Sequence, residues 1–291
     1  MTAMNIVCFG FGQVAKNFIK KLNHDGVSFK LTTTSREESK NKKFKNVDYE
    51  SLQFSEKSFD KNLILSLEEA DHILVSIAPV NGVDIVIKNF QNYFKSKKLK
   101  WITYLSATSV YGNHEGEWVD ENSETKPTSP NGIERLKVEK EWMKLSDKFD
   151  LPFQIFRLSG IYSNQHNILT RLKSGEVKII NKKNQFFSRI HVEDIANILS
   201  SSLSQLKKNE VYNISDDKPA PAEEVAMYGV KLLGVNKPKT IEINEIESRM
   251  LKNFYKDSKK VDNKKIKKFF NCKLKFPTYV EGLNYIFNKS I

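Results

Sequence analysis

Twelve residues near the start of the chain, MNIVCFGFGQVA (4–15), constrain the fold more than any other stretch. The first six form a short apolar run of the kind that a buried parallel strand makes. Gly10 and Gly12 follow directly, and the next segment carries Val14, Phe18 and Leu22 at spacings of four. That spacing gives a helix over about 13–23 one apolar face. The stretch therefore predicts a strand, a tight turn and an amphipathic helix.

Strand and helix patterns continue to alternate along the chain. Strands are expected at 28–34, 71–77, 101–106, 153–158, 177–180, 188–192 and 210–214, and helices at about 82–96, 131–147, 193–206 and 221–233. The polar segment SREESKNKK (35–43) is interpreted as a loop. This order predicts an α/β fold with a doubly wound parallel sheet of the Rossmann type over residues 1–160. Residues 161–291 are expected to form a smaller, irregular α/β region, from which strands near 186–192 and 210–214 return to the core.

The glycine turn has the features of a dinucleotide site. Gly10 permits the tight turn, and Gly12 lets a pyrophosphate approach the backbone. The helix start at Phe11, Gln13 and Val14 supplies amide N–H groups and the positive end of the helix dipole. Because ligands of doubly wound sheets lie beyond the carboxyl ends of the strands, Ala78 and Pro79 in SIAP (76–79) are also expected beside the cofactor.

The end of the second strand indicates which dinucleotide binds. A carboxylate about 20 residues beyond the glycines would hold the ribose hydroxyls of NAD, but the chain has Thr34, Ser35 and Arg36 there. A guanidinium with a neighbouring hydroxyl suits the 2′-phosphate of NADP. We therefore predict NADP, with NAD as the alternative if Glu37 turns toward the ribose.

Composition excludes several other classes of protein. No apolar run approaches the length of a membrane span, and the first residues lack the charged start of a signal peptide, so we expect a cytoplasmic protein and no membrane partner. The two cysteines, Cys8 and Cys272, form no metal-binding spacing. The net charge of +12 comes from lysines spread over most expected surfaces, without a nucleic-acid-binding motif, so no nucleic-acid partner is predicted.

Four ordered motifs resemble a known superfamily. After GFGQVA come YLSATSVYG (104–112), SPNGIERLKVE (129–139) and SRIHVEDIA (188–196). Together they resemble the extended short-chain dehydrogenase/reductases, which include nucleotide-sugar epimerases and dehydratases, and the chain looks closest to atypical NAD(P)-binding members. The resemblance implies a small-molecule substrate, such as a nucleotide-sugar, bound in the C-terminal region. It also implies a homodimer formed through the helix that begins near Asn131.

The resemblance also implies a catalytic pattern that this sequence does not keep. The superfamily uses a Tyr-x-x-x-Lys pair, whose positions fall on Asn131 and Arg135, and a Ser or Thr that falls on Ala107, between Ser106 and Thr108. An amide does not titrate in the useful range, and a guanidinium stays protonated. Arg135 and Ser106 could still contact the cofactor. Substitute acid or base candidates are Thr108, Tyr111, His114 and Tyr162, the last two on the substrate side.

The last motif supplies a candidate for substrate binding. Arg189 lies two residues before His191, and the resemblance implies that it meets a substrate phosphate. Asp194 is expected to cap the following helix and His191 to be a buried structural histidine. Because no second cluster completes a ligand set, no metal site is predicted.

Two classes of function remain. The first is an NADP-dependent epimerase/dehydratase-like oxidoreductase with a rearranged acid/base group. The second is a non-catalytic NADP(H)-binding sensor or regulatory protein, which the absence of the tyrosine favours.

Overall fold

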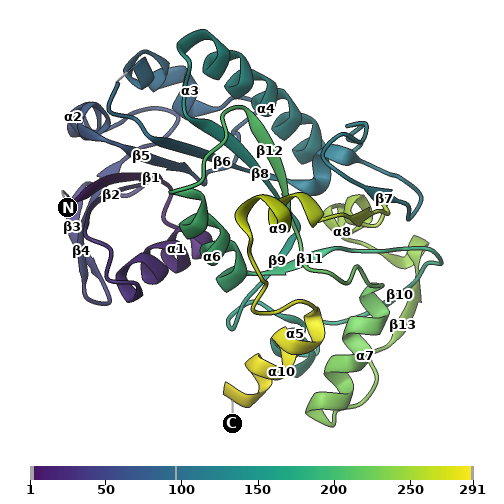
Figure 1. Cartoon of the computed structure of the whole chain (residues 1–291). Helices are drawn as coiled ribbons and strands as arrows, with labels where there is room; N and C mark the ends of the chain where they lie inside the picture. Colours follow the sequence, from purple (N-terminus) through teal and green to yellow (C-terminus); the bar gives the residue numbers. More distant parts are fainter. Residues whose placement is uncertain (1–2, 96, 290–291) are drawn as a thin grey trace. The chain divides into compact units, whose positions relative to one another are not determined.

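The computed structural model describes residues 3–95 and 97–289, apart from the side chains at 249 and 250. The chain forms two compact units that exchange segments along its length (Figure 1). Unit 1 contains residues up to 106, with 134–157 and 195–212. Unit 2 contains 107–133, 158–194 and the residues from 213 onward. This division differs from the single boundary near residue 160 that we expected from the sequence.

The central sheet has eight strands, most of them within unit 1. Their order is β12 (Glu210–Ile214), β8 (Phe153–Leu158), β6 (Trp101–Ala107), β5 (His72–Val75), β1 (Met4–Phe9), β2 (Phe29–Ser35), β4 (Val47–Gln53) and β3 (Lys40–Phe44). The pairs β1–β2, β1–β5, β5–β6 and β2–β4 are parallel. The sheet confirms the predicted Rossmann-type α/β fold, with β1 at the point where the strand order reverses.

One edge of this sheet corrects the sequence analysis. The segment expected to be a loop contains β3, which pairs antiparallel with β4. Strand β3 reads KNKKF; Lys40 and Lys43 are exposed, and Lys42 is half-buried. Lysines on an edge strand oppose pairing with a further strand. The three lysines of β3 thus lie on an edge strand, where their charge has a structural use.

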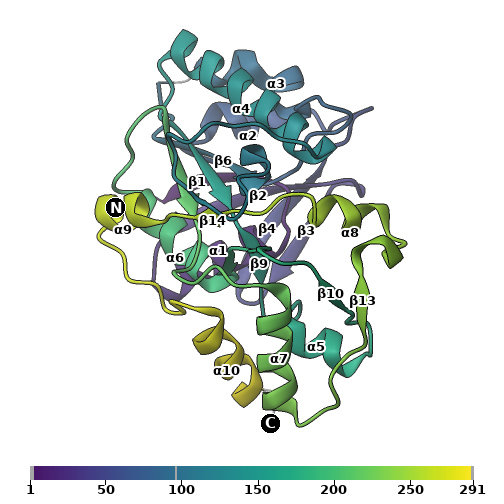
Figure 2. The same ribbon diagram turned by 90° about the vertical axis from the view of Figure 1, so that its right-hand side faces the viewer.

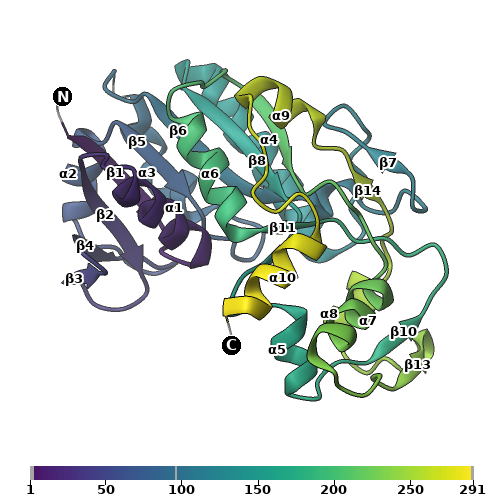
Figure 3. The same ribbon diagram turned by 60° about the horizontal axis from the view of Figure 1, so that its bottom comes forward.

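Helices cover both faces of the sheet (Figures 1 and 3). Helices α1 (Gln13–His24) and α6 (Val192–Ser202) lie on one face, where Phe18 stacks on Trp101, whose indole N–H donates to Ser202. Helices α2 (Asn62–Glu69), α3 (Ile85–Phe90) and α4 (Pro130–Phe149) lie on the other, where Trp142 stacks on Phe153. The helix expected over 82–96 is shorter, since α3 passes into the 3-10 helix η1 (Gln91–Lys95); residue 96 lies outside the described residues.

Unit 2 is built from short elements. Its two-stranded parallel sheets are β9 (Gly160–Tyr162) with β11 (Arg189–His191), β10 (Ile179–Asn181) with β13 (Thr240–Glu242), and β7 (Trp118–Val119) with β14 (Lys260–Val261). Helices α5 (Ile168–Lys173), α7 (Ala222–Leu233) and α10 (Tyr279–Lys289) lie near one another in Figure 2. The remaining helices are η2 (Thr108–Tyr111), η3 (Ile243–Glu245), α8 (Arg249–Phe254) and α9 (Lys264–Phe270).

Only one of the two expected returning strands joins the central sheet. Strand β12 lies at its edge, whereas β11 pairs with β9 in a separate sheet. Within the part of the chain that the structure describes, no helix has the length and apolar character needed to cross a membrane.

Candidate functional site

The glycine turn of unit 1 has the geometry that a bound pyrophosphate needs. Gly10 has a φ of 86°, and a Cβ there would lie 2.7 Å from Cγ2 of Ile77. The turn is held because the Gly10 N–H donates to Oγ1 of Thr34 at 2.9 Å. Gly12 caps α1 without a side-chain hydrogen bond, and nothing lies within 4 Å of where its Cβ would be. The backbone at Gly12 is therefore open to close approach by a ligand.

A cavity of about 910 Å³ adjoins this turn. Its lining brings together six of the residues predicted to bind the cofactor, namely Gly10, Phe11, Ser35, Arg36, Ala78 and Pro79. Three other predicted residues of the turn do not line it: Gly12 is exposed, Gln13 is half-buried and Val14 is buried in the core. The volume is within the range of cofactor pockets.

Two neighbouring residues of opposite charge, Arg36 and Glu37, line this cavity. Arg36 is exposed and, among the described residues, makes no hydrogen bond or ion pair. Glu37 pairs with Lys42 at 2.9 Å and with Lys40 at 3.5 Å. These lysines hold the pKa of Glu37 below its usual value, with the Lys42 hydrogen bond as the largest cause. The cation is thus free for a ligand, whereas the carboxylate already has partners on β3.

Residues missed by the sequence analysis also support the turn. Ser76 donates its hydroxyl to the carbonyl oxygens of Phe9 and Gly10, at 3.0 and 3.1 Å. Lys57 lines the cavity and adds a second cation. Ser76 belongs to the SIAP segment, so a hydroxyl at the end of a buried strand was the available signal. Lys57 follows a strand that had not been predicted.

Helix α4 carries the two positions where the superfamily has tyrosine and lysine. Asn131 is exposed in the first turn, within unit 2. Arg135 is half-buried one turn later, and its Nη1 donates to the Leu105 carbonyl at 2.9 Å within unit 1. The guanidinium also lies near Tyr104, whose pKa burial raises and Arg135 lowers in part. Arg135 therefore has a structural partner at the end of β6.

The first turn of α4 packs tightly on η2. A Cβ at Gly132 would lie 2.6 Å from the Ser109 carbonyl oxygen and 2.9 Å from Cβ of Pro127. The Gly132 N–H donates to Oγ of Ser129 at 3.2 Å. The glycine and serine of SPNGIERLKVE thus seat the helix on the loop before it.

The substitute acid or base candidates on this side have structural partners. Tyr111 is fully buried, and its hydroxyl lies 2.7 Å from Oδ1 of Asn213. Nε2 of His114 lies 3.1 and 3.2 Å from the carbonyl oxygens of Tyr111 and Glu124. Both side chains therefore have structural partners within unit 2. Thr108 is half-buried at the start of η2, and Ser106 is buried at the end of β6 with its hydroxyl lacking a described partner.

Unit 2 has its own cavity of about 620 Å³. Tyr162 and Arg189, both predicted to bind substrate, line it together, whereas His114 does not. Nη1 of Arg189 donates to the Phe187 and Ala220 carbonyls at 2.9 and 3.0 Å, which orients the guanidinium. The Tyr162 hydroxyl is buried with no described partner, and burial raises its pKa. The cavity can therefore bind an anionic group through Arg189.

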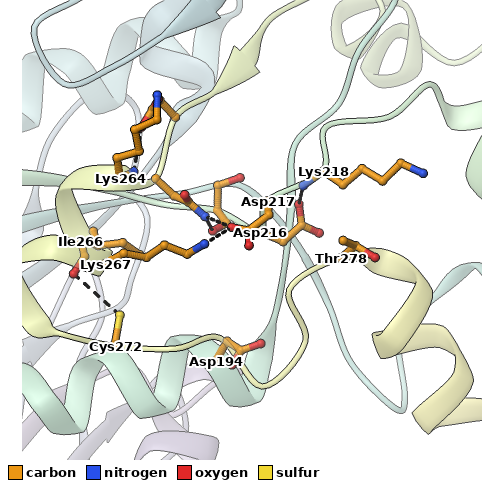
Figure 4. Close-up of polar contacts among 12 residues, drawn as sticks. Asp194, Asp216, Asp217, Lys218, Lys264, Ile266, Lys267, Cys272 and Thr278 are labelled. Carbon is orange, nitrogen blue, oxygen red and sulfur yellow. Dashed lines mark hydrogen bonds and ion pairs between the residues drawn. The ribbon is translucent and has the colours of Figure 1, made fainter.

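A carboxyl near Arg189 was not predicted from the sequence. Figure 4 shows Asp216 beside Asp217, which accepts hydrogen bonds from Asn263 and Lys267. Asp216 is buried, accepts one from the Lys218 N–H at 3.2 Å, and its Oδ2 has no hydrogen-bond partner among the described residues. Burial raises the pKa of Asp216 to about 8. The side chain is thus largely protonated at neutral pH.

The histidine and aspartate of the last motif hold the C-terminal segment. His191 is 1% exposed and packs on the Phe276 ring, 4.2 Å between centroids, and burial lowers its pKa to about 4. Asp194, expected to cap α6, instead accepts the N–H groups of Lys275 and Phe276 at 2.6 and 3.0 Å. Within the described ranges, no three His, Cys, Asp or Glu side chains gather to hold a metal ion.

The fold and the glycine turn define a class, and comparison with known proteins names it. The chain belongs to the NAD dependent epimerase/dehydratase family, whose sequence model matches residues 7–215. This confirms the resemblance to the extended short-chain dehydrogenase/reductases.

Individual relatives extend over most of the chain. A functionally unknown conserved protein from Silicibacter pomeroyi DSS is 30% identical, with 99% of both chains covered and a TM-score of 0.86. A curated protein of Methanocaldococcus jannaschii, "Putative UDP-glucose 4-epimerase", is 26% identical over 246 residues, 76% of this chain and 80% of that one. The dTDP-glucose 4,6-dehydratase of Bacillus anthracis str. Ames, solved in complex with NAD, has a TM-score of 0.77 at 18% identity and coverage of 98% and 96%. That last likeness shows the fold alone.

Proposed function

We propose that this chain is an NADP(H)-dependent oxidoreductase of the epimerase/dehydratase type that acts on a nucleotide-sugar or a similar small carbonyl or hydroxyl compound. The observation that carries the proposal is the 910 Å³ cavity, which joins the glycine turn to Ser35, Arg36, Ala78 and Pro79. Bound there, the nicotinamide group would supply hydride transfer. The α1 amides would hold the pyrophosphate, and Arg36 with Ser35 would hold the 2′-phosphate.

The cavity of unit 2 supports the substrate part of the proposal. Arg189 offers a cation already aimed by two carbonyl oxygens, and a guanidinium pairs with phosphate by two hydrogen bonds. The volume of about 620 Å³ suits a compound of nucleotide-sugar size. The Methanocaldococcus jannaschii relative is named for UDP-glucose, which agrees with that substrate class.

A thermal-shift titration with NADP, NADPH, NAD and NADH tests the cofactor part. A ligand that binds only the folded chain must raise the melting temperature. We expect the largest rise with NADPH, and no rise with any of the four would overturn the proposal. A panel of nucleotide-sugars and small aldehydes, with NADPH absorbance and sugar interconversion as readouts, then tests for a reaction.

The second candidate is a non-catalytic NADP(H)-binding regulator. Two observations favour it: Asn131 occupies the place of the tyrosine, and the phenol of Tyr111 is buried against Asn213. Tight NADPH binding without turnover of any panel compound, together with a change in the protein's protease sensitivity between NADP and NADPH, would favour the regulator over the enzyme.

A further inference from the structure

Arg189 carries a charge that unit 2 does not neutralise. The buried arginine of unit 1, Arg157, pairs with Glu139 at 2.7 Å, whereas Arg189 makes no ion pair within the part of the chain that the structure describes. The buried carboxyl of Asp216 acts on it from a distance, but burial raises the pKa of Asp216 to about 8 and leaves it largely uncharged at neutral pH. A half-buried cation without a counterion is unfavourable, so an anionic ligand would stabilise this site.

The guanidinium of Arg189 is held in one orientation and keeps unused donors. Its Nη1 donates to the carbonyl oxygens of Phe187 and Ala220, two residues that pair with each other in a β-bridge. Nε and Nη2 have no hydrogen-bond partner among the described residues. These two nitrogens form the side of a guanidinium that matches the two oxygens of a carboxylate. Because Arg189 lines the 620 Å³ cavity, the cavity has an oriented bidentate donor for one anionic group.

Most of the cavity wall around Arg189 is apolar. Strands β10 and β13, helix α7 and the segment around α8 contribute its buried aliphatic and aromatic side chains, which include Ile180, Val225, Ile241, Ile246 and Tyr255. Phe187 and Phe254 also line it, with their rings stacked at 4.4 Å between centroids. The body of a bound ligand would therefore contact carbon atoms over most of its surface.

The polar side chains within this wall already have structural partners. Oδ1 of Asn167 accepts two N–H groups of α5, and its Nδ2 donates to two carbonyls of the preceding turn. The hydroxyl oxygens of Ser188 and Ser248 accept backbone N–H groups. The Tyr162 hydroxyl packs against α10, where a Cβ at Gly282 would lie 2.1 Å from it. A ligand with many hydroxyl groups would leave some of them unpaired, which is unfavourable in a buried site.

The exposed charged side chains that line the cavity form its rim, and carboxylates outnumber cations there. The described members of the rim are Glu176, Glu223, Glu245, Glu247, Arg171 and Lys178. Glu223 pairs with Lys237 at 3.5 Å. The side chain at 249 lies outside the described residues. A pyrophosphate would bring two negative charges past this rim to one inner guanidinium, whereas a single carboxylate matches the charge of Arg189.

We propose that the unit 2 cavity binds the carboxylate of an acid with an apolar aliphatic or aromatic body. Arg189 pairs with the carboxylate through Nε and Nη2, and the body lies against the apolar wall. The inference deepens the proposed function and rests on it for the claim that this acid is the substrate. It selects an apolar hydroxy or oxo acid from the small compounds considered above, and a nucleotide-sugar becomes an outcome of the test.

Two pairs of probes that differ in charge test the cavity without turnover. Isothermal titration calorimetry compares 4-phenylbutyrate with 4-phenylbutan-1-ol and hexanoate with hexan-1-ol, and UDP-glucose serves as the nucleotide-sugar. The acids should bind with a Kd of about a few millimolar or lower, as expected for ligands of about ten heavy atoms. Each acid should bind about tenfold or more tightly than its alcohol, because the alcohol lacks the charge-assisted pair. Equal affinity of acid and alcohol, or no detectable binding of either acid, would overturn the proposal.

Hydrogen exchange with mass spectrometry locates the bound probe in the wild-type protein. 4-Phenylbutyrate should slow exchange in peptides that contain Arg189 and residues 220–226, and leave the glycine turn at 10–14 unchanged. Protection confined to other peptides would contradict the assigned site. If UDP-glucose protects the peptides of this cavity and binds more tightly than both acids, the ligand is a nucleotide-sugar and the inference is wrong.

Two matched variants test the role of the guanidinium. Arg189→Gln removes the charge and keeps a donor for the two carbonyls, and it should weaken 4-phenylbutyrate about tenfold or more while leaving the alcohol within about threefold. Arg171→Gln removes an exposed cation from the rim of the same cavity and should leave the acid within about threefold, since exposed charges contribute little. Equal effects of the two variants would refute the assignment to Arg189. If Arg189→Gln does not fold, the exchange data on the wild type decide.

The inference and the proposed function fail in different experiments. The NADPH-induced thermal shift reports on the cavity of unit 1, whereas the acids report on the cavity of unit 2. Absence of NADPH binding would overturn the proposed function and leave an acid-binding site at Arg189. NADPH binding without binding of the acids would overturn the inference and leave the proposed function intact.

Discussion

Replacing Arg36 with alanine should abolish the preference of the protein for NADPH over NADH. Arg36 is exposed at the cavity, and among the described residues it makes no hydrogen bond or ion pair. Its removal therefore breaks no internal contact, and the melting temperature without ligand should not change. What is lost is a guanidinium facing the position we assign to the 2′-phosphate.

The size of the effect follows from the exposure of this pair. A hydrogen bond to a charged group contributes about 1.5–3 kcal/mol, and we take the lower end because water competes at an exposed site. At about 1.4 kcal/mol for each tenfold change in affinity, NADPH should bind roughly 10- to 30-fold more weakly. NADH lacks the phosphate, so its affinity should stay within about twofold of the wild-type value.

Isothermal titration calorimetry of both cofactors at constant ionic strength measures these affinities. Lys43→Ala is the matched control, because Lys43 lies on β3, pairs with Asp48 at 3.7 Å and does not line the cavity. It removes one positive charge from unit 1 at a position outside the cavity and should leave NADPH affinity nearly unchanged. Equal losses for NADPH and NADH in Arg36→Ala, or equal effects of the two variants on NADPH, would refute the assignment.

Three further substitutions test the structure around the two cavities. Gly10→Ala places a Cβ 2.7 Å from Cγ2 of Ile77 at a φ of 86°, so we expect a loss of about 1–3 kcal/mol in urea unfolding and no NADPH-induced thermal shift; a normal shift would contradict the assigned turn. Glu139→Gln breaks the buried pair with Arg157, whose Nη2 lies 2.7 Å from Oε2, and should lower the free energy of unfolding by about 3–5 kcal/mol, whereas a loss below about 1 kcal/mol would contradict a tightly coupled pair. Asp216 has a folded pKa of about 8 against an ordinary value of 3.8, so the folded chain binds more protons between these values and the wild type should lose stability as pH rises through them. Asp216→Asn cannot ionise, and melting temperatures from pH 5 to 9 should fall less steeply for this variant; parallel curves would contradict the burial of an ionisable carboxyl.

Local signals in the sequence predicted the elements that carry the cofactor. The strand, glycine turn and helix over 4–24 form where the pattern placed them, because an apolar run, two glycines and a period of four act within a few residues of each other. Strand β3 was missed because its burial pattern has no apolar alternation, and its pairing with β4 is what makes it a strand. An edge strand of this kind forms because it pairs with a neighbouring strand, so its own sequence gives little sign of it.

The roles of single polar residues depended on tertiary contacts that no local pattern reports. Tyr111 lies in the predicted motif, but its burial and its bond to Asn213, which is distant in sequence, become visible only in the fold. Proposals about proton transfer therefore needed the structure, whereas proposals about the dinucleotide did not.

In the stretch SPNGIERLKVE, the residues that match the superfamily support the fold, and the residues that differ occupy the positions of its catalytic side chains. Gly132 lets α4 approach η2, Ser129 accepts the Gly132 N–H, and Glu139 neutralises the buried Arg157. Each of these contacts stabilises the fold with or without a reaction, so the match to the superfamily at these positions is no sign of catalysis. The two positions that differ, Asn131 and Arg135, are the ones whose side chains would carry the proton. Whether this chain has a reaction therefore depends on residues outside the motif.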